Sequence, residues 1–325
     1  MQKKIGLRHT AAIILAAVIL IMTGLGAYAE PVFGYSSKAA SAAPAEPIFS
    51  YSSMVPVTKG RSGITFDFCE VAGQRLYGYD TLQGACANGG FLYYTLFDRN
   101  KNKCRIVKMK RSSLKVEKVS APLPVYHANN LTYNTKKNLL LATCCQVKGK
   151  RAVFIDPDTL TVVSKKDIKL KASKKIPKSV VRKYKGFTAI AYNEKHDCYV
   201  GRLRGNNNVI IFNGSLDPVR YVKLKGKKTG LLNQGMESVG DYIYDVRSFK
   251  GKHKYSMVTI HNMSGTCVGK MKFPYGTKPG KELECLFHDG SRFYVGFYYS
   301  TNQKHDDEEH HVKRSNYIYE LRTAS

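Results

Sequence analysis

One short pattern occurs twice in the chain at widely separated positions. The segments "QGACANGGFLYY" (residues 83–94) and "QGMESVGDYIY" (residues 234–244) both begin with Gln-Gly, have glycine at the seventh place and have aromatic residues at the ninth and eleventh. The two copies start 151 residues apart (234 − 83). Internal repetition strongly limits the possible folds, because each unit must pack against copies of itself.

Three further segments have the same plan of a polar start, an apolar strand, a polar turn and a second apolar strand. They are "HANNLTYNTKKNLLLATCC" (127–145), "GFTAIAYNEKHDCYVGRL" (186–203) and "ELECLFHDGSRFYVGFYY" (282–299), and Tyr192-Asn193 matches Tyr133-Asn134. The starts fall near residues 83, 127, 186, 234 and 284. This spacing suits a unit of about 40–50 residues with four short strands. The distance of 151 residues then corresponds to three units.

The sequence between these starts also predicts strands. "CRIVKMK" (104–110) and "KVEKVS" (115–120) alternate apolar and polar residues, and no amphipathic helix of three turns is expected after residue 60. We therefore predict an all-β chain, a β-propeller of five blades, with six left open. Residues 63–80 are expected to complete the last blade and close the ring, which removes exposed strand edges.

The first 58 residues are predicted to lie outside this domain. Residues 1–29 have a basic start, an apolar run of 16 residues and a small-x-small site before Glu30, as in a bacterial signal peptide. An uncleaved anchor is the alternative, although a membrane span wants about 20 apolar residues. Residues 30–58 contain "EPVFGYSS" and "EPIFSYSS" in Ala/Ser-rich sequence and are interpreted as a flexible linker. The propeller is assigned to residues 59–325, outside the cell.

The charge balance favours polyanionic partners. The chain has 52 Lys and Arg against 24 Asp and Glu, and 52 minus the three in the signal leaves 49, a formal charge of +25. Such an excess attracts anionic polymers, and outside a bacterium these are envelope polymers and glycans rather than nucleic acid. Residues 165–185 hold ten basic residues and one acid, and residues 223–228 form a second basic cluster. Solvated surface loops are the simpler interpretation of either run.

Eight cysteines leave the redox state open. No CxxC spacing occurs, and two of the cysteines are adjacent, so a disulfide framework and a partly reduced set are both compatible with the sequence. The segment "HDDEEHH" (305–311) is interpreted as a solvated loop rather than a metal site.

In a propeller the inner strands start around one central channel, so polar residues repeated at the starts should converge. Oxygen ligands there suit a Ca²⁺ or Mg²⁺ ion, a sugar or a phosphate, and His127 is a candidate general base if Glu237 or Glu284 orients it. The alternative is that these groups only satisfy one another and channel water. The predicted ligand-binding residues are Gln83, His127, Asn129, Asn130, Gln234, Glu237, Glu282 and Glu284.

The end of the chain, "KELECLFHDGSRFYVGFYYS" followed by "SNYIYELR", and the segment "HANNLTYN" resemble the helveticin J-like family of secreted bacteriocin-like proteins of Gram-positive bacteria. The resemblance covers about the last 200 residues and consists of blade signatures. It implies a propeller fold, an extracellular setting and a growth-inhibiting activity. The basic segment 165–185 departs from the family pattern.

These observations predict a secreted, basic, monomeric β-propeller that binds an anionic cell-envelope polymer or glycan through its surface and central funnel, with no membrane insertion once the signal is cleaved. A bacteriocin-like effector and a metal-assisted lyase or hydrolase acting at the funnel are the alternatives. No catalytic motif is present, so a binding role is favoured over an enzyme, with the ligand unspecified.

Overall fold

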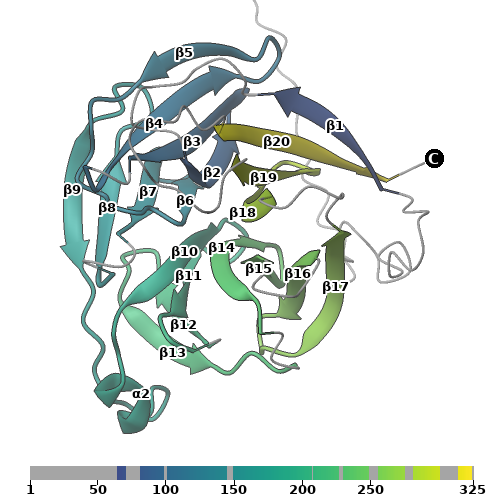
Figure 1. Ribbon diagram of the computed structural model, residues 1–325. Coiled ribbons are helices and arrows are strands. Elements are labelled where there is room, and N and C mark those ends of the chain that lie inside the picture. Colours follow the sequence, from purple (N-terminus) through teal and green to yellow (C-terminus); the bar gives the residue numbers. More distant parts are fainter. Residues whose placement is uncertain are drawn as a thin grey trace, which may run out of the picture. The chain divides into compact units, whose positions relative to one another are not determined.

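Five four-stranded antiparallel sheets make up the computed structural model, and they are arranged as the blades of a β-propeller (Figure 1). The structure describes residues 64–70, 81–98, 101–144, 149–206, 208–226, 230–248, 255–274, 281–300 and 314–323. The predicted signal peptide, the linker and the segment 305–311 lie outside these residues.

Each blade runs from an inner strand at the axis to an outer strand at the edge. The first three blades are β2 (Thr81–Asn88), β3 (Phe91–Asp98), β4 (Lys103–Lys110) and β5 (Lys115–Val119); β6 (Leu131–Asn134), β7 (Leu139–Thr143), β8 (Arg151–Ile155) and β9 (Val162–Asp167); and β10 (Phe187–Asn193), β11 (Cys198–Leu203), β12 (Val209–Asn213) and β13 (Pro218–Val222).

The fourth blade is β14 (Leu232–Val239), β15 (Tyr242–Ser248), β16 (Tyr255–Asn262) and β17 (Cys267–Pro274). The fifth takes β18 (Lys281–Asp289), β19 (Arg292–Ser300) and β20 (Arg314–Thr323) from the end of the chain and β1 (Ile64–Glu70) from its beginning. The five-blade prediction is confirmed, and the six-blade option is excluded. The one helix among the described residues is α2 (Lys178–Arg182), so the expectation of no long helix holds there.

The ring is closed by a strand from the far end of the sequence. β1 pairs antiparallel with β20 over seven residues, from Ile64 opposite Thr323 to Glu70 opposite Tyr317. β1 therefore supplies the outer strand of the last blade, as the sequence predicted for residues 63–80. Figure 1 shows β1 beside β20.

Around the axis, each inner strand packs against the inner strands of both neighbouring blades, and β18 of the last blade packs against β2 of the first. Apolar side chains fill the space between adjacent blades. One such cluster joins Tyr93 and Ile106 of the first blade to Leu131 and Val153 of the second. Another joins Val246 and Ile260 of the fourth blade to Val295 of the fifth. Burial of these faces stabilises the ring, because a single blade cannot bury both of its sides.

The repeated Gln-Gly pair marks the same structural position in two blades. Gln83-Gly84 and Gln234-Gly235 each lie at a register shift near the start of an inner strand. A Cβ atom on Gly84 would lie 2.4 Å from the backbone nitrogen of Leu131 in the next inner strand. Only glycine allows the two backbones to approach this closely. The glycine repeats because inner strands are crowded at the axis.

The repeated Tyr-Asn pair ends the inner strands β6 and β10. The Asn134 side chain accepts a hydrogen bond from the Lys137 backbone N–H at 2.9 Å, and Asn193 accepts one from His196 N–H at 3.0 Å. Each asparagine thus caps a four-residue turn. Each also donates to the following blade, Asn134 to the Tyr199 hydroxyl and Asn193 to the Ser238 hydroxyl.

A buried charge cluster joins the third blade to the fourth. Arg202 is completely buried; it donates to the Thr188 hydroxyl, to the backbone oxygens of Gln234 and Gly235, and to the Asp245 carboxylate. Burial raises the pKa of the Asp245 carboxyl, but Arg202 and Arg247 outweigh it and hold this pKa below its usual value. The Gln-Gly backbone of the fourth blade is therefore fixed from its third-blade side.

The six cysteines whose side chains the structure describes are free thiols, and five of them are buried. Burial raises the pKa of Cys86 and of Cys104, which keeps both protonated at neutral pH. They act as small apolar residues of the core. Cys145 and the side chain of Cys69 lie outside the described part of the protein.

The crowding at Gly84 can be tested by comparing two alanine substitutions. Gly84→Ala forces β2 away from β6 and should lower the free energy of unfolding by about 3 kcal/mol or more. Gly89→Ala is the matched control, because Gly89 has a φ of +57° and no neighbouring atom within 4 Å of the new Cβ. It should cost about 1 kcal/mol from backbone strain alone. Urea unfolding curves that place the two variants at equal stability would contradict this account.

Candidate functional site

At the start of the inner strands, four of the predicted residues form a chain of hydrogen bonds across the channel. His127 Nδ1 and Asn129 Oδ1 lie 2.6 Å apart, Asn129 Nδ2 donates to Gln234 Oε1 at 3.0 Å, and Gln234 Nε2 donates to Glu282 Oε1 at 2.5 Å. The chain links the second, fourth and fifth blades. These side chains bind one another, which is the structural alternative that the sequence left open.

A second set of hydrogen bonds, made by the Asn130 side chain, joins the inner strands next to this hydrogen-bonded chain. Asn130 donates to the Ile190 carbonyl at 2.8 Å and accepts from the Met236 backbone N–H at 2.9 Å. It therefore connects the second blade to the third and the fourth. With 2% of its surface exposed, Asn130 is part of the core of the ring.

The remaining predicted residues do not share one site. Gln83 is buried in β2, where its Nε2 donates to the Leu82 carbonyl, and Glu284 is buried in β18. Glu237 is placed near the end of β14, whereas Gln234 is near its start. The predicted residues are thus distributed along the channel, and Glu237 contacts His288 instead of His127.

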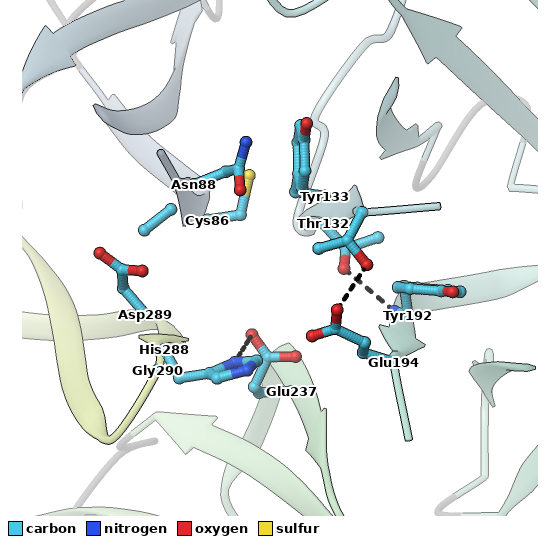
Figure 2. Close-up of a pocket in the computed structure, with 12 residues that line it drawn as sticks. Cys86, Asn88, Thr132, Tyr133, Tyr192, Glu194, Glu237, His288, Asp289 and Gly290 are labelled. Carbon is cyan, nitrogen blue, oxygen red and sulfur yellow. Dashed lines mark hydrogen bonds and ion pairs between the residues drawn. The ribbon is translucent and has the colours of Figure 1, made fainter. Parts of the chain in front are cut away.

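A pocket of about 260 Å³ lies where the inner strands end (Figure 2). Its walls come from all five blades, because the last residues of each inner strand and the turns after them meet there. The twelve lining residues are Cys86, Ala87, Asn88, Thr132, Tyr133, Thr135, Tyr192, Glu194, Glu237, His288, Asp289 and Gly290.

Glu237 and His288 form a polar part of the pocket lining. His288 Nδ1 lies 3.5 Å from Glu237 Oε2, and the side chains are 26% and 7% exposed. Glu237 Oε1 accepts the Ser238 backbone N–H at 2.7 Å. Burial lowers the pKa of His288, but the Glu237 carboxylate more than compensates, with a smaller contribution from Glu194, and the net pKa is raised.

Hydrogen bonds between the second and third blades hold another part of the pocket lining. Thr135 Oγ1 donates to Glu194 Oε1 at 2.9 Å, and Thr132 Oγ1 accepts from the Tyr192 backbone N–H at 3.0 Å. Tyr133 is fixed by stacking on Tyr93, with ring centroids 6.5 Å apart. Figure 2 shows Glu194 on one side of the pocket and the Glu237–His288 pair on another.

The sequence did not single out His288, Glu194 or Thr135. These residues follow the apolar part of each inner strand, and the turn after it has two residues in the first, fourth and fifth blades and four in the second and third. The alignment of repeats is weakest there. Among the described residues, no group of three or more His, Cys, Asp or Glu side chains is arranged to hold a metal ion.

A basic surface feature lies at the other end of the inner strands. Residues 165–185, here called the basic arm, comprise the last three residues of β9 and most of the connection to β10. This connection includes α2, which projects beyond the outer strands in Figure 1. Nine of its ten basic residues are exposed, and within the described part of the protein no ion pair engages any of those nine: Lys165, Lys169, Lys171, Lys174, Lys175, Lys178, Arg182, Lys183 and Lys185. The tenth, Lys166, pairs with Asp217, and the one acid, Asp167, pairs with Arg151.

Apolar anchors hold the basic arm against the third blade. Ile168, Leu170 and Ile176 are buried in a cluster that includes Phe187 and Phe212. The Lys175 carbonyl accepts the Tyr221 backbone N–H of β13 at 3.0 Å. The nine exposed cations therefore belong to an element that packs against the third blade.

No protein-family model matches the sequence, and no curated protein does. Several solved structures resemble the chain at low sequence identity. The tail fibre of Staphylococcus aureus phage P68 has a TM-score of 0.53 and 13% identity, with 80% of this chain and 53% of the fibre covered. Hydrazine synthase from Kuenenia stuttgartiensis has a TM-score of 0.39 and 12% identity, with 76% of this chain and 64% of that one covered. A "putative exported protein" of Bacteroides fragilis has a TM-score of 0.43 and 9% identity, with 83% of this chain and 98% of that one covered.

In the described residues, no helix has the length and apolarity needed to cross a bilayer.

The pairing of Glu237 with His288 can be tested by measuring the pKa of His288. The pKa of His288 should exceed its ordinary value of about 6.5, and Glu237→Gln should bring it below that value, because burial then outweighs the smaller effect of Glu194. The ion pair stabilises the fold fully below the unfolded pKa, and this contribution is lost as pH rises through the raised folded pKa. Histidine Cε1–H shifts in NMR spectra measure both changes. Glu194→Gln is the control and should lower the pKa less; an equal effect of the two substitutions would contradict the pairing.

Proposed function

We propose that this protein binds an anionic cell-envelope polymer outside the cell, and that the basic arm is the principal contact. The observation that supports the proposal most directly is the set of nine exposed cations on one packed element, none of which pairs with an acid among the described residues. Ordering these side chains costs less on a packed element than on a free loop, so more of the charge attraction appears as affinity. A polymer with repeating phosphate or carboxylate groups is complementary in charge to this set of cations.

The channel is less suited to a polyanion than the arm. One end is crossed by the hydrogen-bonded chain from His127 to Glu282, and the pocket at the other end contains three acidic residues. Carboxylates repel an anionic polymer. The proposal therefore assigns the polymer to the surface and assigns no polymer contact to the funnel.

The growth-inhibiting activity that the helveticin-like resemblance implies is a separate proposal. An inhibition zone on a lawn of related bacteria around the purified protein would support it. If the protein binds the polymer but does not inhibit growth, the binding function is supported and the growth-inhibiting activity is contradicted.

Polymer binding predicts a loss of affinity when the arm is neutralised. Replacing Lys169, Lys171, Lys174 and Lys175 by Gln should weaken binding to immobilised poly(glycerol phosphate) roughly tenfold at about 0.1 M salt, because four exposed charge contacts are lost. Binding by the native protein should also fall as salt is raised. Biolayer interferometry over a series of salt concentrations measures both effects.

The matched control changes the net charge by the same amount elsewhere. Lys101, Lys103, Lys110 and Lys115 are exposed residues of the first blade without described ion pairs, and their replacement by Gln should reduce binding much less. If both quadruple variants lose affinity equally, net charge rather than the arm governs binding. If neither does, the proposal is wrong.

A further inference from the structure

The pocket at the ends of the inner strands has a charge opposite to that of the chain. The protein has 52 Lys and Arg against 24 Asp and Glu, yet among the twelve described residues that line the pocket three are acidic and none is Lys or Arg. A random sample of such a basic surface would contain more cations than acids. The lining is therefore acidic although the chain as a whole is basic.

The cations near the pocket each pair with an acidic side chain of a neighbouring blade, and one of these acids, Asp289, itself lines the pocket. Lys136 pairs with Asp197, Lys195 and His196 both pair with Asp241, and Arg111 pairs with Asp289. These ion pairs link the turns of neighbouring blades around the pocket. In the described part of the protein, no Lys or Arg pairs with Glu194 or Glu237, and the partner of Glu237 is His288.

The walls suit a small organic ligand better than a metal ion. Tyr133 and Tyr192 line the pocket beside the two glutamates, and Asn88 and Thr132 add neutral polar groups. Calcium requires six to eight oxygen ligands, whereas an ammonium group is bound by one or two carboxylates with aromatic rings around its carbon body. A volume of about 260 Å³ admits a molecule of the size of one sugar or one amino acid.

We propose that this pocket binds a primary ammonium group on a small organic body, with Glu194 and Glu237 as the countercharges and Tyr133 as an apolar wall. The site is distinct from the basic arm. The arm precedes β10, and the pocket is lined by Tyr192 and Glu194 at its far end, about 20 Å away along a strand of seven residues.

Isothermal titration of the full protein with matched ligand pairs tests the proposal. Glucosamine is compared with glucose, and D-alanine methyl ester with methyl lactate, since each pair differs in the ammonium group. In one pair or both, the amine should bind at least tenfold more tightly than its hydroxyl counterpart. The amine that binds more tightly shows whether the pocket prefers an amino sugar or an amino-acid ester. Equal binding within both pairs, or no binding by either amine at 50 mM, would overturn the proposal. Calcium chloride is the third ligand, and binding of calcium without binding of amines would replace the proposal with a metal site.

Variants locate the site. Glu194 is exposed, so Glu194→Gln should fold normally and weaken amine binding about tenfold, and Glu237→Gln should do the same if it folds. Glu117→Gln removes an exposed carboxylate from β5 and should have no effect. The quadruple variant of the basic arm should bind amines normally, which separates failure of this proposal from failure of polymer binding. Amine binding that survives Glu194→Gln unchanged would rule this pocket out.

Discussion

Pairing of β1 with β20 is the interaction on which the rest of the structure depends. It joins residues 64–70 to residues 314–323 and completes the fifth blade. Without it, the last blade would expose an unpaired edge, and the ring would be held only by the packing of β18, β19 and β20 against β2. Both the pocket and the hydrogen-bonded chain at the channel start draw side chains from several blades, so each exists only in a closed ring.

The fold could be predicted because its repeats carry physical requirements. Gly84 and Gly235 recur where inner strands crowd together, and Asn134 and Asn193 recur where a strand must end in a capped turn. These requirements act within one blade or between neighbours, so they appear in the sequence at the blade spacing. The spacing then indicates five or six blades and the need for a closing strand.

The candidate site was predictable only in part. Periodicity identified the inner strands, but a strand of eight residues is about 26 Å long. Gln234 and Glu237 are three residues apart, yet Gln234 belongs to the chain at the channel start and Glu237 to the pocket. His288 and Glu194 were missed because turn lengths differ between blades. The basic run was visible in the sequence, but its burial of Ile168 and Ile176 against Phe187 and Phe212 is a tertiary effect.

The molecule thus presents opposite charges at the two ends of its inner strands, cations on the basic arm and carboxylates in the pocket. Both features depend on ring closure, and cross-linking tests closure most directly. Cys69 of β1 lies opposite Ile318 of β20, and opposite residues in antiparallel strands are close enough for a disulfide. Under mild oxidation, the Ile318→Cys variant should form a 69–318 disulfide detectable by peptide mass spectrometry, and a Tyr319→Cys variant should not form 69–319. No cross-link at 318, or equal cross-linking at both positions, would contradict closure of the ring by β1.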